Sequence, residues 1–425
     1  MALETAFTMD SSAIKYGPGV TREVGYDMEA LGARRVMVVT DMNLVNSETV
    51  SVVVESLRTA KIDAVVFDRV RIEPTDVSFK EAIRFALDGQ FDGYVAVGGG
   101  STIDTAKAAD LYSTYPADFL AYVNPPIGQG RLIPGRLKPL VAIPTTAGTG
   151  SETTGVAIFD LLEMHAKTGI AHRQLRPVIG IVDPNNTRTL PKMVTACTGW
   201  DVLCHAIESI TALPFHQRPG PDHPGLRPAY QGSNPISDIW AARAIEMVSK
   251  NIVRVLENPS DDEARGQMLL AATFAGIGFG NAGVHLPHGM SYPVSGMVRD
   301  FVPAGYPQDH PIIPHGMAVI LNAPAVFRFT GPANPGPHLY AAGLMGIDTA
   351  DTRPADAGEL LAGAIVRLMR QTGMPNGLKA VGYGPDDVDH LVAGTVPQHR
   401  VTKLSPRPAD ETTLGELFLS AMTYW

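Results

Sequence analysis

The amino-acid sequence predicts an α/β unit with a parallel, doubly wound sheet, followed by an all-helical unit. Over the first 190 residues, short apolar runs alternate with stretches of helical spacing. Beyond Asp183-Pro184 the strand-like runs stop, and long helix-like stretches dominate. Short apolar strands separated by helices are typical of parallel sheets, whose two faces are both covered. We therefore expect one domain over residues 1–189 and a second, helical domain over residues 190–425.

Five apolar runs of the first domain predict strands, because each is short, rich in β-branched residues and bounded by turn residues. In order they are 36–40 (VMVVT), 64–67 (AVVF), 93–97 (GYVAV), 140–143 (LVAI) and 179–182 (IGIV). Helical spacing between them predicts helices over 47–60 and 78–88. In the second domain the same spacing predicts helices over 194–211, 236–257, 262–279 and 358–372. Two irregular segments rich in proline, 214–235 and 298–314, are typical of functional loops.

Composition narrows the class of protein. Of the 425 residues 45% are hydrophobic and 18% are charged, with a net charge of −9. This apolar content excludes a mainly disordered chain, and an acidic balance without basic clusters argues against a nucleic-acid partner. We expect no membrane partner either, since no apolar run approaches the ~20 residues of a membrane span.

The cysteines and the first residues bear on the compartment. With only two cysteines, Cys197 and Cys204, we expect a reducing environment, and we assign both to the core. Residues 1–17 resemble neither a secretory signal nor a transit peptide. We therefore expect a cytoplasmic location, or the mitochondrial matrix for a eukaryotic protein whose leader has been removed.

Two glycine-rich turns follow predicted strands. The first, Gly98-Gly99-Gly100-Ser101-Thr102, leads from strand 93–97 into a helical stretch over 103–111, which Ser101 or Thr102 can cap. Glycines let a ligand approach the backbone, and free N–H groups at a helix start favour an anion such as a pyrophosphate. The second turn, 145–152 (TTAGTGSE), follows strand 140–143. Both turns lie where ligands of parallel sheets bind, and tight turns without a ligand are the alternative.

Asp41 ends the strand 36–40. A carboxylate in this place can accept hydrogen bonds from the ribose hydroxyls of NAD and would repel the 2′-phosphate of NADP. An ordinary loop or helix-capping aspartate is the alternative.

Four residues predict a metal site. Asp201 and His205 are four apart, so that a helix places both on one face. His288 and His315 each follow a bend, in a Pro-His-Gly context. One carboxylate and three imidazoles suit Fe²⁺ or Zn²⁺. The alternative is an Asp201–His205 ion pair and histidines that are hydrogen-bonded in the core or in loops.

In their order along nearly the whole chain, these motifs resemble those of the iron-containing (group III) alcohol dehydrogenases. The likeness lies in 98–107 (GGGSTIDTAK), 144–152 (PTTAGTGSE), the Asp201–His205 helix and the motifs of His288 and His315. It implies a dehydroquinate synthase-like architecture, with an NAD-binding α/β domain, a helical catalytic domain, the site in the cleft between them, and a homo-oligomer. Three segments, 227–238, 275–285 and 400–404, further resemble the hydroxyacid–oxoacid transhydrogenase branch of this family.

The resemblance also implies residue roles. It assigns a divalent metal, Fe²⁺ in preference to Zn²⁺, to Asp201, His205, His288 and His315. It assigns NAD to Asp41, Gly98, Gly99, Gly100, Ser101, Thr102, Thr145, Thr146, Thr149 and Lys167. Two positions depart from the family pattern: Tyr292 stands where many members have a second histidine, and His285 stands where many have glycine. We take His285 and Tyr292 as candidates for the proton relay.

The implied reaction is hydride transfer from 4-hydroxybutyrate to 2-oxoglutarate, and both partners are small molecules. Such carboxylates call for a cation, for which Arg218, Arg227 and Arg299 are candidates, with solvated loop charge as the alternative. Three other functions compete with this one: an alcohol dehydrogenase that exchanges NAD(H) freely, a lyase of the dehydroquinate synthase type, and a non-catalytic scaffold.

Overall fold

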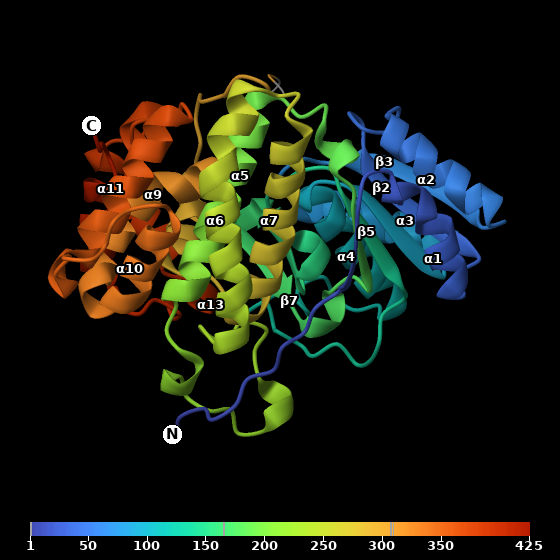
Figure 1. Ribbon diagram of the computed structural model, residues 1–425. Helices are drawn as coiled ribbons and strands as arrows, with labels where there is room; N and C mark the ends of the chain where they lie inside the picture. The colour runs from blue at the N-terminus through green and yellow to red at the C-terminus, as the bar shows by residue number, and fades with distance from the viewer. Residues whose placement is uncertain (1, 165, 307, 309) are drawn as a thin grey trace. The chain divides into compact units, whose positions relative to one another are not determined.

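The computed structural model describes residues 2–425 except 165, 307 and 309, and it divides the chain into two compact units (Figure 1). The α/β unit spans Asp10–Thr189, and the helical unit contains Leu190–Trp425 together with Met1–Met9. The first nine residues, which we expected in the α/β domain, thus belong to the helical unit. There the N–H of Glu4 donates to the carbonyl oxygen of Arg218 at 2.8 Å.

The α/β unit is built on a parallel six-stranded sheet in the order β1-β8-β5-β4-β2-β3. Its strands are β1 (Ala13–Tyr16), β2 (Arg35–Asp41), β3 (Asp63–Val70), β4 (Gly93–Gly98), β5 (Leu140–Pro144) and β8 (Ile179–Val182). The five predicted strands are confirmed. Strand β1 has no apolar run and lies partly exposed at the sheet edge, so its sequence gave no strand signal.

Helices cover both faces of this sheet, as the strand residues require. They are α1 (Val24–Ala30), α2 (Glu48–Thr59), α3 (Asp76–Gly89) and α4 (Gly100–Thr114). Along β2, Val36 and Val38 belong to the same hydrophobic cluster as Leu57 of α2. Met37 and Val39 belong to another cluster, which contains residues of α3 and α4. This alternation is the period of two that a strand buried on both faces shows. An antiparallel pair, β6 (Val156–Leu161) with β7 (Ala166–Ala171), was not predicted.

The helical unit contains the predicted helices and several more. They are α5 (Lys192–Thr211), α6 (Pro235–Glu257), α7 (Asp262–Ala282), α8 (Leu286–Gly296), α9 (His315–Thr330), α10 (Pro335–Leu344), α11 (Ala357–Gln371), α12 (Val388–Thr395), α13 (His399–Thr402) and α14 (Glu411–Ser420). The predictions that match α5, α6, α7 and α11 are confirmed to within a few residues at each end. Cys197 and Cys204 of α5 are buried and free, as predicted.

Helices α8 and α9 were read from the sequence as bends, because Pro-His-Gly looks like a helix breaker. In the structure Pro287 occupies the first turn of α8, and Pro314 lies just before α9. Proline is tolerated at both places, because the first N–H groups of a helix have no partner within it. His288 and His315 therefore lie on the first turns of rigid helices rather than on loops.

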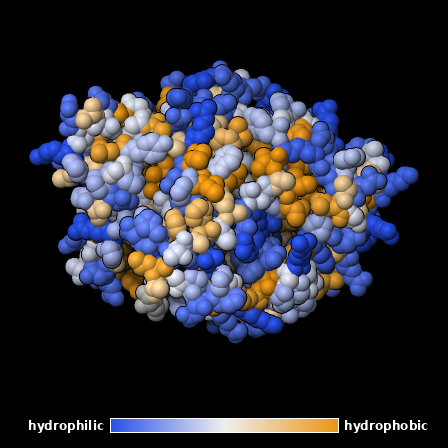
Figure 2. Space-filling model, turned by 60° about the horizontal axis from the view of Figure 1, so that its bottom comes forward, coloured by the Kyte–Doolittle hydropathy of each residue, from blue (hydrophilic) through white to orange (hydrophobic). Residues whose placement is uncertain are grey.

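On the face drawn in Figure 2, groups of hydrophobic residues alternate with hydrophilic ones. The most exposed large apolar side chains among the described residues are Tyr26, Met42 and Ile239, which lie on three separate segments.

The predicted homo-oligomer stays a prediction. Among the described residues, no single helix is long and apolar enough to cross a membrane; α7 and α8, bent by 106°, meet that length and composition test only as a pair.

Candidate functional site

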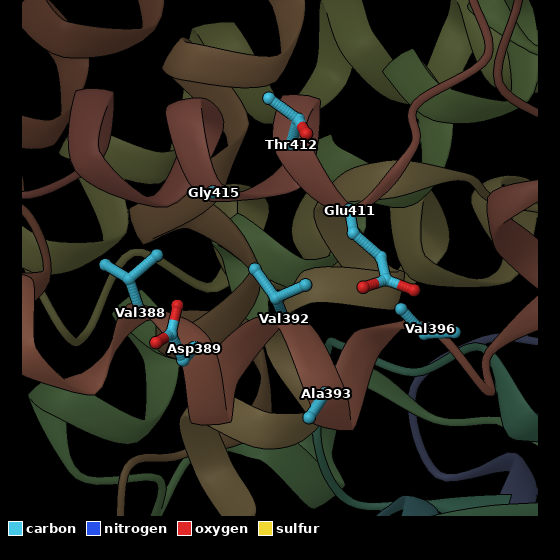
Figure 3. A pocket seen from close by; sticks show the side chains of 8 residues that line it. All are labelled: Val388, Asp389, Val392, Ala393, Val396, Glu411, Thr412 and Gly415. Atoms are coloured by element: carbon cyan, nitrogen blue, oxygen red, sulfur yellow. The ribbon is translucent and has the colours of Figure 1, made fainter.

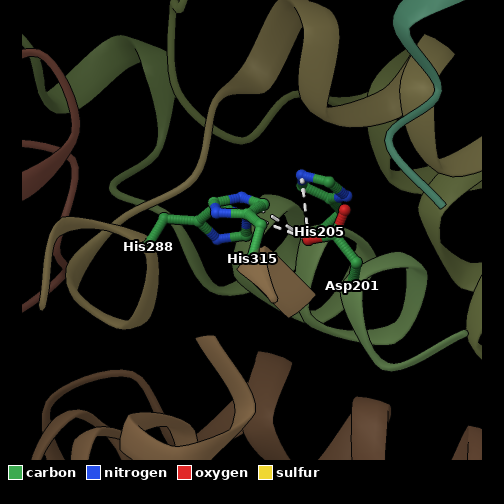
Figure 4. A group of neighbouring side chains, drawn as sticks. All are labelled: Asp201, His205, His288 and His315. Atoms are coloured by element: carbon green, nitrogen blue, oxygen red, sulfur yellow. Dashed lines mark ion pairs between the residues drawn. The ribbon is translucent and has the colours of Figure 1, made fainter. Parts of the chain in front are cut away.

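The structure brings the four predicted metal ligands together in the helical unit (Figure 4). Helix α5 carries Asp201 and His205 one turn apart, α8 carries His288, and α9 carries His315. The Nε2 atoms of the three histidines lie 3.7, 3.6 and 3.7 Å from one oxygen, Oδ1 of Asp201. A tetrahedral ion with bonds of ~2.1 Å holds its ligand atoms about 3.4 Å apart. The spacing therefore fits a divalent ion better than a set of direct hydrogen bonds.

Three side-chain atoms of these four residues are buried without a hydrogen-bond partner among the described residues: Oδ1 of Asp201, Nε2 of His288 and Nδ1 of His205. A buried polar atom left unpaired costs roughly 1–3 kcal/mol. A cation among the four side chains would satisfy Oδ1 of Asp201 and Nε2 of His288 at once. The orphaned atoms and the nitrogen–oxygen donor set thus fit a bound divalent metal.

The local sequence explains why α9 can begin against α5. A Cβ atom on Gly316 would collide with the carbonyl oxygen of Cys197 and would lie 2.9 Å from Cβ of Asp201. Glycine after His315 is therefore required for the close approach that places this imidazole beside the Asp201 carboxylate.

Glu208, for which the sequence predicted no role, orients His288. It is fully buried on α5, and its Oε1 accepts the backbone N–H groups of His288 at 3.1 Å and His285 at 3.3 Å. Its Oε2 contacts Nδ1 of His288. A carboxylate on Nδ1 fixes the tautomer that leaves Nε2 free to bind a metal. Glu208 lies seven positions after Asp201, so helical spacing was the signal that could have found it.

The electrostatics favour an ionised carboxylate at the centre. Burial alone would raise the pKa of Asp201, but His205, His315 and His288 together hold that pKa below its usual range. Burial lowers the pKa of His205 to about 3, which leaves a neutral imidazole. Although burial would also lower the pKa of His288, the Glu208 carboxylate raises it, which favours the charged imidazolium of this residue. Because a metal ion binds an anionic oxygen and neutral imidazoles, Asp201 and His205 are already in the binding form, whereas binding would release a proton from His288.

Aromatic rings pack around the cluster. Phe279 of α7 stacks on His205 with ring centroids 3.9 Å apart. Tyr292, one turn after His288, lies with its ring 6.3 Å from that of His315 at an angle of 26°. Its hydroxyl accepts a hydrogen bond from Nη2 of Arg400 at 2.8 Å. Tyr292 thus adjoins the cluster, as a proton-relay candidate must.

The other relay candidate, His285, lies among different neighbours. Its Nε2 is 2.9 Å from Oγ1 of Thr211, a hydroxyl that itself donates to the carbonyl of Ile207. The imidazole is completely buried, and burial lowers its pKa to about 4. These contacts make His285 a neutral, hydrogen-bonded core residue and favour Tyr292 for the relay.

The predicted cationic partners do not lie at the cluster. Arg227 pairs with Glu4 at 2.9 Å, and the backbone carbonyl of Arg218 contacts the same N-terminal segment. Arg299 is more than half exposed and pairs with Asp387 at 2.8 Å. Each contact involves a segment other than those that carry the metal ligands.

In the α/β unit, the first glycine-rich turn begins α4 earlier than predicted. Gly98 ends β4, and Gly99 is the residue before the helix, which has no side-chain cap. The expectation that Ser101 or Thr102 caps the helix is therefore wrong. Only Gly99 lies between the end of β4 and the start of α4, and the hydroxyl of Ser101 accepts the N–H of Glu73 at 3.3 Å.

The second turn packs directly on the first. The N–H of Thr145 donates to the carbonyl of Gly98 at 3.0 Å. A Cβ atom on Gly100 would lie 2.5 Å from Cγ2 of Thr149, and one on Gly99 would lie 3.2 Å from Cγ2 of Thr146. The two turns therefore form one backbone surface at the carboxyl ends of β4 and β5, where parallel sheets bind ligands.

A buried lysine ties these turns together. Nζ of Lys107 on α4 donates to Oγ of Ser151 at 2.6 Å and to the carbonyl of Val156 at 2.8 Å. Ser151 in turn donates to Asp104 at 2.6 Å. Burial lowers the pKa of Lys107 to about 8, against the charge of Asp104, which raises it.

Of the two remaining NAD-binding candidates, Asp41 lies at the carboxyl edge of the sheet, whereas Lys167 is held in ion pairs on β7. Asp41 ends β2, which neighbours β4, so it lies at the same sheet edge as Gly98. Its Oδ1 accepts the N–H of Asn43 at 2.8 Å. Lys167 of β7 is buried and forms ion pairs with Glu73 at 2.7 Å and Asp160 at 2.9 Å. Although burial would lower it, these two carboxylates raise the pKa of Lys167, so that this side chain stays charged.

Another pocket, between α12 and α14, lacks comparable chemistry (Figure 3). Its described lining is Val388, Asp389, Val392, Ala393, Val396, Glu411, Thr412 and Gly415. Two carboxylates without histidine or cysteine do not repeat the donor set of the metal cluster.

A doubly wound parallel sheet with glycine-rich turns, together with a helical unit that holds three histidines and an aspartate, is the combination expected of a metal-dependent dehydrogenase. Two family models match the chain: iron-containing alcohol dehydrogenase over residues 11–184, and the C-terminal part of the Fe-containing alcohol dehydrogenase family over residues 229–422. The chain belongs to the iron-containing alcohol dehydrogenase family and is an oxidoreductase.

Three similar proteins place the chain within this family. The mitochondrial hydroxyacid-oxoacid transhydrogenase of Bos taurus is 54% identical over 419 residues, which are 98% of this chain and 90% of the relative. A crystal structure of 1,3-propanediol oxidoreductase is 28% identical, with a TM-score of 0.85 over 98% of this chain and 100% of that one. Sulfoacetaldehyde reductase from Bifidobacterium kashiwanohense, solved in complex with NAD⁺, is 25% identical, with a TM-score of 0.80 over 99% of each chain.

These matches confirm the predicted fold class and the oxidoreductase class, in preference to a lyase or a scaffold. The bovine relative is mitochondrial by name. The expected cytoplasmic location therefore gains no support, whereas the mitochondrial alternative agrees with this relative.

Proposed function

We propose that this chain is a metal-dependent, NAD-linked hydroxyacid–oxoacid transhydrogenase, which moves hydride from a hydroxy acid such as 4-hydroxybutyrate to an oxo acid such as 2-oxoglutarate. The products are succinate semialdehyde and 2-hydroxyglutarate. The observation that carries the metal dependence is the set of three imidazole nitrogens at 3.6–3.7 Å from one buried carboxylate oxygen. The likeness to the bovine transhydrogenase supports the substrate class.

The proposal gives the metal to Asp201, His205, His288 and His315, with Fe²⁺ favoured by the family and Zn²⁺ compatible with the same donors. When bound, the ion acts as a Lewis acid toward the oxygen of the reacting substrate. Glu208 and Phe279 hold the imidazoles of His288 and His205 in place. The hydroxyl of Tyr292 accepts from Arg400, so its own proton is available to the substrate oxygen.

The proposal gives NAD to the α/β unit. The pyrophosphate would accept hydrogen bonds from N–H groups at the start of α4, supplied by the turn from Gly98 to Thr102. Thr145, Thr146 and Thr149 line the second turn, toward the nicotinamide half, and Asp41 would bind the adenosine ribose. Lys167 is assigned by family resemblance, and its two ion pairs favour a role in holding β6 and β7.

The decisive experiment uses metal-loaded protein without added NAD. 4-Hydroxybutyrate is supplied with and without 2-oxoglutarate, and succinate semialdehyde and 2-hydroxyglutarate are quantified. Many turnovers that require 2-oxoglutarate would support a transhydrogenase with resident NAD. Turnover that starts only when free NAD is added would replace the proposal with an alcohol dehydrogenase that exchanges its cofactor. The Asp201→Asn variant serves as the metal-deficient control.

A further inference from the structure

Among the described residues, the guanidinium of Arg400 has no carboxylate partner. It lies on the short helix α13, its side chain is largely buried, and its Nη1 is buried with no hydrogen-bond partner. Its neighbours are the hydroxyl of Tyr292, at 2.8 Å from Nη2, and the ring of Tyr230, whose centroid is 5.0 Å from the guanidinium carbon. Burying a cation without a counter-charge is costly, so such an arrangement favours an anionic ligand.

Arg400 lies close to the metal cluster, so the anion that it binds would be part of the reacting substrate. Tyr292, which accepts the hydrogen bond from Arg400, lies with its ring 6.3 Å from the ring of His315. Only one side chain therefore separates the unpaired guanidinium from the metal cluster. Arg400 as a whole residue keeps partial solvent exposure, although Nη1 itself is buried.

Two glycines make this placement possible. A Cβ atom on Gly289, the residue after His288, would lie 2.8 Å from Cγ2 of Thr402. Helix α13 therefore packs against α8 at the point where α8 carries a metal ligand. A Cβ atom on Gly283 would lie 2.9 Å from Cβ of Tyr230, and the side chain of Leu404 is closer still.

The same contacts unite the three segments, 227–238, 275–285 and 400–404, that separate this chain from simpler alcohol dehydrogenases by sequence. The N–H of Gln231 donates to the carbonyl of Asn281 at 2.8 Å, and that of Gly232 to Ala282 at 2.8 Å. Leu404 and Tyr230 then meet at Gly283. The three segments thus contact one another, and Tyr230 of the first lies against the guanidinium of Arg400 in the third.

We infer that Arg400 is the residue that binds the carboxylate of the substrate, and that it selects acids over uncharged alcohols. This inference rests on the proposed function for the presence of a carboxylate substrate. A guanidinium presents parallel N–H groups that match the two oxygens of a carboxylate. Tyr292 positions the fork by accepting from Nη2, which leaves Nη1 for the ligand.

The test compares Arg400→Gln with the wild-type holoenzyme on 4-hydroxybutyrate and on 1,4-butanediol, which has the same carbon chain without the charge. Loss of a buried charge-assisted contact lowers kcat/KM on the order of 100-fold. We expect a loss of this size for the acid, mainly in KM, and a much smaller loss for the diol, which feels only the lost hydrogen bond to Tyr292. The ratio of the two substrates should shift accordingly. Equal losses on both substrates, or no loss on the acid, would overturn the inference.

Two further variants separate recognition from folding. Arg400→Lys keeps the charge and loses the fork, so we expect it to retain part of the preference for the acid. Arg407→Gln removes an exposed arginine, which donates to the carbonyl of Phe329, and should leave both substrates unaffected. A preference for the acid in Arg400→Gln equal to that of the wild type would contradict the inference even if overall activity fell.

A binding measurement needs no turnover. Succinate, an unreactive dicarboxylate, is titrated calorimetrically into metal- and NAD-loaded protein. We expect its affinity to fall on the order of 100-fold in Arg400→Gln, with the metal content unchanged; an unchanged affinity would refute the role of Arg400. If the wild type oxidises 4-hydroxybutyrate only with free NAD yet still prefers it to the diol, the transhydrogenase proposal fails and the role of Arg400 stands.

Discussion

The two units of this chain treat their buried polar groups in opposite ways. In the α/β unit the buried ammonium of Lys107 is satisfied by side-chain and backbone oxygens, with Asp104 beside it. In the helical unit, buried atoms of Asp201, His288 and Arg400 have no partner. Among the described residues, every such orphaned side-chain atom except Nδ2 of Asn124 lies in the helical unit.

This difference indicates two ways of building a binding site. At the metal cluster and at Arg400, the helical unit offers side chains that lack partners, so that a ligand would complete the hydrogen bonding there. The α/β unit offers backbone N–H groups, and its side chains are satisfied because they hold that backbone in shape. A substitution in the helical unit should remove a ligand contact directly, whereas one in the α/β unit should act by moving the turns.

The largest effect is expected for Asp201→Asn, which removes the anionic ligand of the cluster. Structural zinc sites are worth roughly 10–16 kcal/mol, so one of four ligands carries about 3 kcal/mol or more, which corresponds to about 100-fold in metal affinity. Metal per chain after dialysis, measured by mass spectrometry, checks this. Asp238→Asn is the control, because Asp238 is hydrogen-bonded to Ser233 outside the cluster. Full metal occupancy in Asp201→Asn would contradict the ligand assignment.

Lys107→Met tests whether side chains of the α/β unit act by holding the two glycine-rich turns in place. It leaves Asp104, Ser151 and the carbonyl of Val156 without their shared donor. We expect NADH affinity to fall about 30-fold, or ~2 kcal/mol, because the two turns are no longer tied together. Fluorescence titration of NADH measures this, and metal content should stay at the wild-type value.

The control for this experiment is Lys80→Met, which removes a partly exposed lysine paired with Asp76 in the same unit. If Lys107→Met lost metal and kept its affinity for NADH, the two units would not be independent in the way the contrast requires.

Glu208→Gln should have a smaller effect than Asp201→Asn. The glutamine oxygen can still accept the backbone N–H groups of His285 and His288, but its amide cannot accept from Nδ1 of His288. Loss of such a supporting partner costs about 10-fold in metal affinity, at the lower end of the range for these contacts. Competition with a calibrated chelator measures the affinity. Glu246→Gln, which changes a half-buried partner of Arg243 outside the cluster, is the control. Equal metal affinities in the two variants would contradict the orienting role of Glu208.

Most helices and strands whose hydrophobic residues repeat with a clear helical or strand period were predicted from the sequence. The valines of β2 and the helical spacing of α5 indicated their structures, and Asp201 with His205 followed from that spacing. Helices α8 and α9 were missed because Pro287 and Pro314 look like breakers away from their structural context. In the first turn of a helix the missing N–H of proline costs nothing.

Arg400 could not be read in the same way. Its contact with Tyr292 joins residues 108 positions apart, and it depends on the room that Gly289 leaves for Thr402. The role of Glu208 could have been predicted from its helical spacing to Asp201. The role of Arg400 depends on how α13 packs against α8, which the sequence does not show. Sequence likeness marked the segment 400–404 without indicating what its arginine faces.

The smallest effect is expected at Asp110, an α/β residue whose hydrogen bonds do not offset the cost of burying its charge. It is buried on α4 and accepts from Thr114 at 3.0 Å and from the N–H of Lys138 at 3.2 Å, both through Oδ1. Burial raises its pKa from 3.8 to about 7. The folded state then binds more protons than the unfolded state between pH 4 and 7, so stability falls as pH rises through this range.

Asp110→Asn removes that dependence, because the amide carries no charge at any pH in this range. We expect the variant to be more stable than the wild type at pH 8 by about 1 kcal/mol, since the amide must still be buried. Below pH 4 the two proteins should be similar, and denaturant unfolding at several pH values measures the difference. A variant less stable at pH 8 would mean that the Asp110 carboxylate has a counter-charge, and that the α/β unit satisfies this group too.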